Sequence, residues 1–265
     1  MLCKCGWRLC LLEHPSPSNF YVSCWQGTRS AAPLLLLRGF FFLLSTCVLI
    51  ASIAVPLTSN THFGYWFIYI THWGFLLIVL TAGFGTAVSA YAYFKRPIDA
   101  TFGLPWYVKT YWILYNITIP VAFLITVFYW GILKTSANTV NFAPNPVLDV
   151  MLHGVNSAVM LVELVCSAHP SRLMHVMQPL YFAGAYMLFS VIYYFAGGLD
   201  PWGNRFIYPV VDWSKPEQTM VVITLTALFL ALMHLLTVGI ASARDAIAKR
   251  RLAVPAGVYN DAFTP

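Results

Sequence analysis

The stretch FFFLLSTCVLIASIAVPL, residues 40–57, contains no charged side chain and decides the fold class. A helix needs about 20 mostly apolar residues to cross the hydrocarbon core of a bilayer, so residues 39–57 are long enough to form a membrane-spanning helix. Outward from this stretch, five more segments have the same character. They lie at 65–92, 108–133, 148–167, 178–197 and 219–241.

The composition agrees with a membrane protein, because 59% of the 265 residues are hydrophobic and only 9% are charged. An ordinary soluble domain has roughly 25% charged residues, and a disordered chain combines low hydrophobicity with high net charge. Both classes are excluded, and so is a nucleic-acid-binding protein despite the net charge of +6. We predict an all-α polytopic membrane helical bundle with six transmembrane helices, which has the lipid bilayer as a partner.

The distribution of basic residues predicts the orientation of this bundle. All but three of the 15 Lys and Arg residues lie in the two tails or in loops on the same side as the tails. The three exceptions are Lys134, Arg205 and Lys215. Because Lys and Arg are in excess on the cytoplasmic side, both termini are expected there. This divides the chain into a cytoplasmic tail 1–38, a six-span domain 39–241 and a cytoplasmic tail 242–265, with the plasma membrane as the expected location.

The cysteines and the common cofactor motifs predict neither a cofactor nor a metal site. Cys3, Cys5 and Cys10 do not have the spacing of zinc ligands, and cytoplasmic thiols stay reduced. They are either free thiols or, beside basic residues, sites of S-acylation. The chain contains no phosphate-binding loop and no Gly-rich dinucleotide-binding pattern.

Polar residues are concentrated in the fourth predicted span, which contains Asp149, His153, Asn156 and Glu163. At about 100° per residue they share one helix face, which should point into the bundle because ionisable side chains are costly in lipid. Counting residues places His234 of the sixth span and Asn116 of the third at the depth of Glu163. We therefore predict a buried polar network of Asp149, Glu163, Asn116 and His234, in which Glu163 bonds His234 or Asn116.

A second group of polar residues is expected in the outer half of the membrane. Thr71 and His72 of the second span should reach the same depth as His153 and Asn156. These residue types fit either a hydroxyl nucleophile with an imidazole base or a passive hydrogen-bonded network. The spacing alone favours the passive network, because a Thr in a membrane helix usually bonds its own backbone.

Four stretches of the chain resemble the rolling stone family of multipass membrane proteins. They read NFYVSCWQ (19–26), WFIYITHWGF (66–75), LHGVNSAVMLVELVCSAHPSRLMH (152–175) and SVIYYFAGGLDPWGNRFIYPVVDWSKP (190–216). The similarity covers the chain from about residue 20 to residue 236. It implies an animal protein that acts without catalysis in cell–cell (myoblast) fusion or in muscle development, with a membrane protein or a lipid as its partner.

The chain is also similar, more distantly, to the androgen-induced six-span hydrolases, which cleave fatty acid esters of hydroxy fatty acids. Their Thr nucleophile follows a Trp on an early span, and the matching Trp66 implies Thr71 as nucleophile here. The position of their catalytic His is taken by Asn156, whereas the preceding His of the motif is kept as His153. Because an amide cannot take up a proton, this alternative function, an intramembrane threonine-type lipid esterase, requires His153 or His72 as the base.

The loop from Gly198 to Glu217 contains three amphipathic aromatic residues, Trp202, Tyr208 and Trp213. Such rings are typical of the membrane–water interface. We expect the loop either to rest on the lipid surface or to present a contact surface to another membrane or protein. With Asn156 in place of the catalytic His, the sequence favours the non-catalytic function over the esterase.

Overall fold

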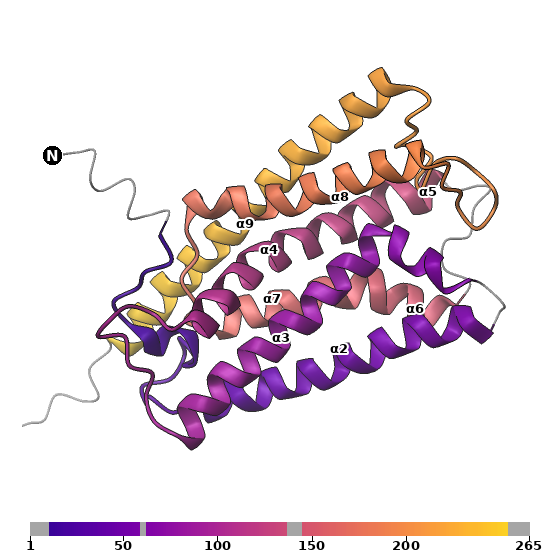
Figure 1. Cartoon of the computed structure of the whole chain (residues 1–265). Helices are drawn as coiled ribbons and strands as arrows, with labels where there is room; N and C mark the ends of the chain where they lie inside the picture. The colour runs from indigo at the N-terminus through magenta and orange to yellow at the C-terminus, as the bar shows by residue number, and fades with distance from the viewer. Residues whose placement is uncertain (1–10, 59–61, 137–144, 254–265) are drawn as a thin grey trace, which may run out of the picture.

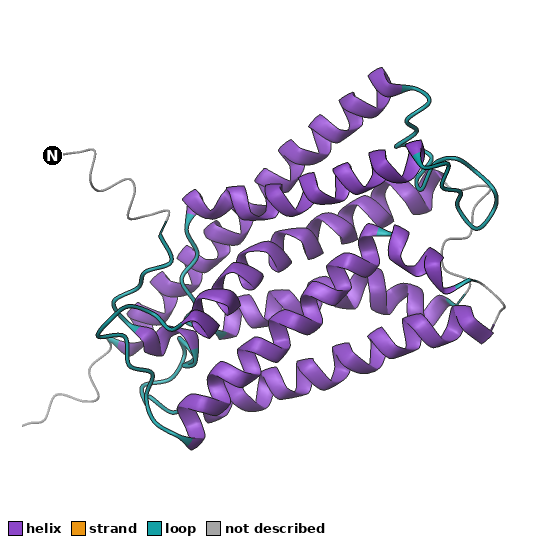
Figure 2. Ribbon diagram, in the orientation of Figure 1, coloured by secondary structure: helices purple, strands orange, loops and turns teal. Residues whose placement is uncertain are grey.

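The chain folds into a bundle of long helices, as the computed structural model of the protein shows (Figure 1). The structure describes residues 11–58, 62–136 and 145–253. Within these residues six segments are helical, long and apolar enough to cross a membrane, and the only β-type pairing is two isolated bridges (Figure 2). The predicted all-α membrane bundle with six spans is therefore confirmed.

Two of the six long segments contain a π-helical turn. In chain order the six are α2 (Ala32–Thr58), α3 (Ile70–Phe94), α4 with the π-helical turn η3 (Trp106–Phe128, Tyr129–Leu133), α6 with the π-helical turn η4 and α7 (Pro146–Val150, Met151–Val155, Asn156–Cys166), α8 (Met177–Phe195) and α9 (Pro216–Leu252). The short elements are η1 (Pro17–Phe20), η2 (Phe63–Ile68), α5 (Lys134–Ser136) and η5 (Leu173–Val176).

Two helices extend into the predicted tails. α2 begins at Ala32, inside 1–38, and α9 continues to Leu252, inside 242–265. Both extensions carry an arginine that hydropathy assigns to water but that is buried here, Arg38 in α2 and Arg244 in α9. The Arg244 guanidinium donates to two backbone carbonyls, so its donors are satisfied without solvent. The outer parts of both tails, with Cys3, Cys5 and Cys10, lie outside the described residues.

The second predicted span, 65–92, is not one continuous helix. The 3-10 helix η2 ends at Ile68, Tyr69 has extended backbone angles (φ −93°, ψ 128°), and α3 begins only at Ile70. The side chains of Trp66 and Ile68 are buried, so η2 packs onto the bundle as a separate short element. This break places Thr71 in the first turn of α3, near the membrane boundary.

The helix α4 is the centre of the bundle. It packs against α3, α7, α8 and α9, and its residues Trp112, Tyr115 and Ile119 are completely buried. The coloured start of the chain and the end of α9 lie at the same end of the bundle, which we call the terminal end (Figure 1). The opposite end, with the loop 196–215, is called the loop end.

Candidate functional site

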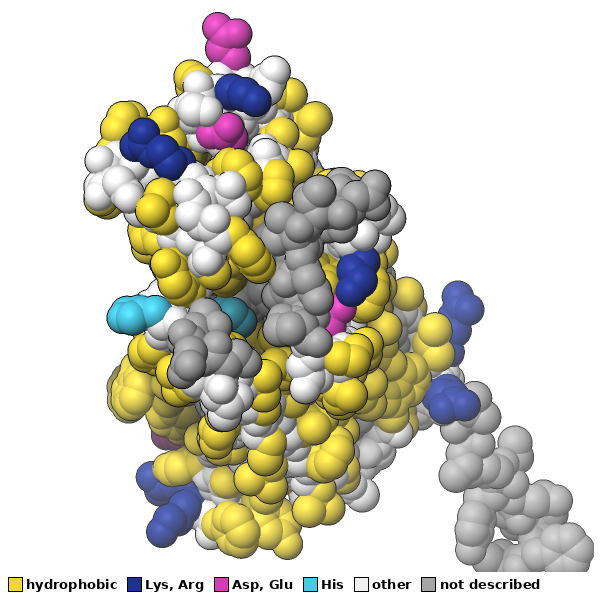
Figure 3. All heavy atoms as spheres, turned by 90° about the vertical axis from the view of Figure 1, so that its right-hand side faces the viewer, with side chains coloured by type: hydrophobic (Ala, Val, Ile, Leu, Met, Phe, Trp, Pro, Cys, Tyr) yellow, Lys and Arg dark blue, Asp and Glu magenta, His cyan; other side chains and the backbone are white. Residues whose placement is uncertain are grey.

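A cavity of about 350 Å³ opens at the loop end, between α2, η2, the start of α3 and the α6–η4 segment. Figure 3 looks onto this end and shows histidine side chains among hydrophobic ones. The volume lies in the range of roughly 300–1,000 Å³ that is usual for small-molecule pockets. The polar residues in its lining are Ser52, His62, Tyr65, Tyr69, Thr71, His72, Tyr129, Asn145, His153 and Tyr208.

His153 is held at the wall of this cavity by Asp149, which lies one turn earlier in the same segment. The two side chains are joined between His153 Nδ1 and Asp149 Oδ1 at 2.9 Å. The second carboxylate oxygen accepts a hydrogen bond of 2.7 Å from Lys134 Nζ, and Tyr129 also hydrogen bonds to this carboxylate. With Nδ1 engaged, Nε2 is the ring nitrogen left for chemistry in the cavity.

Both π-helical turns contribute to this arrangement. Tyr129 begins η3 and His153 lies within η4, and their rings stack with centroids 3.5 Å apart and planes within 8°. A π-helical turn inserts one residue into the helix and re-aims the side chains after it, and such turns are frequent at functional sites. Two irregular turns from different helices therefore fix the plane of the His153 ring.

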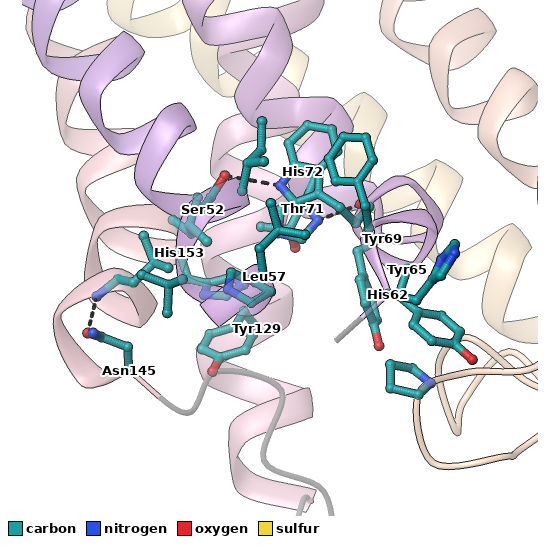
Figure 4. A pocket seen from close by; sticks show the side chains of 18 of the residues that line it. Ser52, Leu57, His62, Tyr65, Tyr69, Thr71, His72, Tyr129, Asn145 and His153 are labelled. Atoms are coloured by element: carbon teal, nitrogen blue, oxygen red, sulfur yellow. Dashed lines mark hydrogen bonds between the residues drawn. The ribbon is translucent and has the colours of Figure 1, made fainter. Parts of the chain in front are cut away.

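Thr71 enters the cavity from the first turn of α3 (Figure 4). Its side chain is hydrogen bonded to the Tyr208 hydroxyl, which also accepts the backbone N–H of Ile70 at 3.1 Å. Burial raises the pKa of Tyr208 to about 12, so its phenol remains protonated at neutral pH. The Thr71 hydroxyl thus bonds a side chain that is distant in sequence, Tyr208, instead of bonding only the backbone of its own helix.

His72, the residue after Thr71, also lines the cavity, and its ring is fixed by Trp66. The two rings stack with centroids 4.6 Å apart, and His72 Nδ1 lies 2.6 Å from the Trp66 carbonyl oxygen. Figure 4 shows His72, Thr71, His153 and Tyr129 gathered around one space. The expected grouping of Thr71 and His72 with His153 is therefore present in the structure.

Asn156, the fourth member of the expected outer group, does not line this cavity. Its side-chain oxygen accepts a hydrogen bond of 2.9 Å from the Thr126 hydroxyl and a second one from the Ser157 backbone N–H. The side chain therefore faces α4, about one turn deeper than His153. The helical-face argument placed it correctly inside the bundle, but a shared face does not mean a shared cavity.

The predicted polar network around Glu163 is wrong in its partners. Glu163 is buried, but its Oε1 accepts hydrogen bonds from Arg38 Nε and Nη2 at 2.9 and 2.7 Å and from the Tyr111 hydroxyl at 2.9 Å. Asn116 bonds His175 and Gln178 instead. The remaining predicted members also have other partners: His234 Nε2 lies 3.1 Å from the Arg172 carbonyl oxygen, and Asp149 bonds His153 and Lys134.

The three aromatic residues of the loop have different environments. Trp202 is half exposed and lines the cavity, and Trp213 donates from Nε1 to the Ser190 hydroxyl at 3.2 Å. Tyr208 is buried between the loop and α3, so an interfacial role for its ring is excluded by its position. The loop therefore closes the cavity at the loop end, where Trp202 and Tyr208 are its aromatic lining residues.

Sequence reasoning missed Tyr129 and Lys134 as parts of the site. Both lie near the end of the third span, where the helical register changes at η3, so no fixed 100° step could place them beside Asp149. The sequence did contain one signal for this contact: the basic Lys134 follows the third span, and the acidic Asp149 lies at the start of the fourth. Among the described residues, no group of three or more His, Cys, Asp or Glu side chains is arranged to hold a metal ion.

Comparison with known proteins gives two matches that cover most of the chain. A family model described as Protein rolling stone matches residues 15–254, which include all six long helical segments. Protein rolling stone of Drosophila melanogaster is 31% identical over 227 residues, which are 81% of this chain and 78% of the relative. No solved structure matches the chain.

Proposed function

This chain belongs to the rolling stone family, and we propose that it is an intramembrane lipid esterase whose nucleophile is the Thr71 hydroxyl. The observation that carries this proposal is the Asp149–His153 pair at the wall of the cavity that also contains Thr71. A carboxylate that orients an imidazole beside a hydroxyl is the arrangement of acyl-transfer enzymes. In this arrangement His153 is the general base, a role that the Asn156 amide cannot fill.

In this mechanism Thr71 Oγ1 attacks the ester carbonyl carbon while His153 Nε2 accepts the hydroxyl proton, and Asp149 stabilises the resulting imidazolium. The carbonyl oxygen becomes an oxyanion, for which the protonated Tyr208 phenol is a donor beside Thr71. When the intermediate collapses, the bond to the alcohol oxygen breaks and the alcohol takes the proton from His153. His153 Nε2 then takes a proton from water, which attacks the acyl carbonyl carbon; the bond to Thr71 Oγ1 breaks, this oxygen takes the proton back from His153, and the acid is released.

The lining of the cavity supports a lipid as substrate. Apart from the polar residues named above, it consists of mostly apolar side chains of α2, η2, η3, the α6–η4 segment and the loop 196–215. Among the described residues, no Lys, Arg, Asp or Glu lines this cavity. Together with the distant resemblance to the androgen-induced six-span hydrolases, this favours fatty acid esters of hydroxy fatty acids as substrates.

The test is ester hydrolysis by the purified protein in lipid nanodiscs, followed by chromatography of the released fatty acid. Thr71→Ala should remove the activity and Thr71→Ser should keep part of it, because serine supplies the same hydroxyl. Thr86→Ala is the matched control, since Thr86 lies on the same helix and bonds its own backbone. Hydrolysis that persists in Thr71→Ala would overturn the proposal.

A second proposal is a role in myoblast fusion or muscle development at the plasma membrane. The similarity to Drosophila Protein rolling stone over most of both chains supports it. Loss of the protein in its own animal should then reduce fusion of muscle precursors. Rescue by Thr71→Ala would separate a non-catalytic fusion role from an enzymatic one, whereas failure of only this variant would connect the two functions.

We also propose that both termini are cytoplasmic. The Lys and Arg distribution supports this orientation, and both ends of the described chain lie at the terminal end (Figure 1). Epitope tags at either terminus should be stained only after cells are permeabilised. Staining of a terminal tag on intact cells would reverse the orientation and place the candidate site on the opposite side.

A further inference from the structure

A second cavity of about 350 Å³ lies between α3, α4, α8 and α9. Figure 1 shows that α8 and α9 diverge toward the loop end, where the outer half of α9 stands apart from the bundle. Residues Val222, Ile223, Thr226 and Ala227 of this half line the cavity. Neighbouring residues on the same half, such as Val221 and Leu225, are about 60% exposed, which places the cavity beside lipid.

The two cavities meet at the candidate nucleophile. Four residues line both of them: Thr71, Tyr129, Leu133 and Tyr208. A group bound at Thr71 can therefore have one substituent in each cavity. An ester has this shape, with an acid part on one side of the reacting carbonyl and an alcohol part on the other.

The chemistry of the two cavities differs. The first contains the three imidazoles of His62, His72 and His153 and the Asn145 amide, and its mouth lies at the loop end. The described residues that line the second include no charged residue, no histidine and no side-chain amide. The polar side chains among its described lining residues carry hydroxyls, and the Ser190 hydroxyl already donates to the Met187 carbonyl oxygen. The second cavity suits a plain hydrocarbon chain, and the first suits a part that carries polar groups.

Resting on the esterase function proposed above, we propose that the second cavity binds the acyl chain of the ester, and that the alcohol part lies in the first cavity. The acyl chain remains in the second cavity while it is attached to Thr71 Oγ1. The hydroxy fatty acid, with its carboxylate, leaves through the mouth at the loop end. The protein therefore selects esters with a long acyl chain, and this chain enters from the bilayer between α8 and α9.

Gly184 of α8 allows the second cavity to be filled without disturbing its wall. It lines the cavity, and a Cβ added there meets no atom within 4 Å. Gly184→Phe should place its ring in the acyl-chain site. Gly239→Phe in α9 is the matched control, because Gly239 also has open space around it but is not among the lining residues. Ala227→Phe, on the facing helix, is a second filling variant that guards against misfolding of the first.

Binding is measured without reference to activity. The full-length protein in nanodiscs is photolabelled with a palmitic acid analogue that carries a diazirine near the chain end, and the labelled residues are mapped by mass spectrometry. Labels are expected on cavity residues of α8 and α9, with loss in Gly184→Phe and retention in Gly239→Phe. Absence of these labels, or their persistence in both filling variants, would overturn the acyl-chain site even if the esterase proposal holds.

Hydrolysis tests the orientation of the ester. For esters that share one alcohol part, Gly184→Phe should reduce hydrolysis of a palmitoyl ester by roughly tenfold or more and leave an acetyl ester unchanged. Equal losses for both esters, or no loss, would contradict the proposed orientation. If the natural protein hydrolyses none of these esters, the esterase function fails, and with it the orientation, while the labelling result still decides whether the cavity holds an acyl chain.

Discussion

Arg38 and Glu163, 125 residues apart in sequence, form an ion pair in which two guanidinium nitrogens donate to a single carboxylate oxygen. Neither side chain is more than 7% exposed. The same guanidinium donates to the Phe20 carbonyl and the Ser89 hydroxyl, so one residue joins α2, α3, α7 and the segment before α2. A buried ion pair becomes strongly destabilising when one partner is removed, because the other charge is left uncompensated.

Glu163→Gln should therefore lower the free energy of unfolding by about 3–5 kcal/mol. The double variant Arg38→Met with Glu163→Leu should recover most of this loss, because it removes both charges and fills the space with apolar atoms. Equilibrium unfolding in mixed detergent micelles measures both values. Glu217→Gln, at an exposed acidic residue of α9, is the control. A Glu163→Gln protein as stable as the unmodified one would show that the pair does not stabilise the fold.

Asp149 should be needed for turnover more than for substrate binding. Asp149→Asn keeps a hydrogen-bonding group beside His153 but removes the charge that stabilises its imidazolium. We expect kcat to fall by roughly 10²–10⁴-fold with little change in KM. Steady-state hydrolysis in nanodiscs checks this, with Asp99→Asn, an exposed loop residue, as the control. Unchanged kcat in Asp149→Asn would exclude His153 as an oriented base.

Asn156→His should not increase hydrolysis, although the distant resemblance to the androgen-induced six-span hydrolases implies position 156 as the site of the base. The Asn156 side chain bonds Thr126 on α4 and does not reach the loop-end cavity. The larger imidazole would instead crowd the contact with α4, where the Thr126 hydroxyl keeps only the Ser157 hydroxyl as a side-chain partner, at a cost of about 1–3 kcal/mol. Hydrolysis rates and unfolding midpoints of the variant measure the two effects. A gain in rate would show that residue 156 can turn toward Thr71.

The six long helices could be predicted from the sequence because membrane spans depend on a local property, the hydropathy of about 20 consecutive residues. The same property failed at Arg38. An arginine lowers the hydropathy of its segment, although the structure satisfies its donors internally with Glu163, Ser89 and the Phe20 carbonyl. A hydropathy scale treats every charged side chain as surrounded by water. It therefore predicts too short a helix where the charge is paired inside the bundle, and α2 begins at Ala32 instead of residue 39.

The grouping of Thr71, His72 and His153 could be predicted by counting residues inward from the membrane boundary. Their partners could not. Asp149 was expected in one polar network with Glu163, but the π-helical turn η4 lies between these residues and separates their environments. Tyr208 was expected at the lipid surface, because no local pattern shows that its hydroxyl bonds the first turn of α3. Contacts that depend on a change of helical register or on a folded loop require the three-dimensional structure.

The burial of His169 should make the free energy of unfolding depend on pH. It lies in the loop after α7, is completely buried, and stacks on Tyr115 with ring centroids 3.7 Å apart. Burial, and then the nearby charges of Arg38 and Arg244, hold the pKa of His169 well below its usual 6.5, with a smaller contribution from His14.

Below pH 6.5 the unfolded chain binds a proton at His169 that the folded protein does not bind, so stability is lost as the pH falls below this value. The loss for one such group is about 1.4 kcal/mol per pH unit. His169→Phe keeps a flat ring against Tyr115 and cannot be protonated, so its stability should fall less steeply between pH 6.5 and 5. Unfolding free energies at three pH values in this window measure the slope, and His62→Phe, at an exposed histidine, should leave it unchanged. Parallel curves for His169→Phe and the unmodified protein would mean that His169 takes up its proton without unfolding.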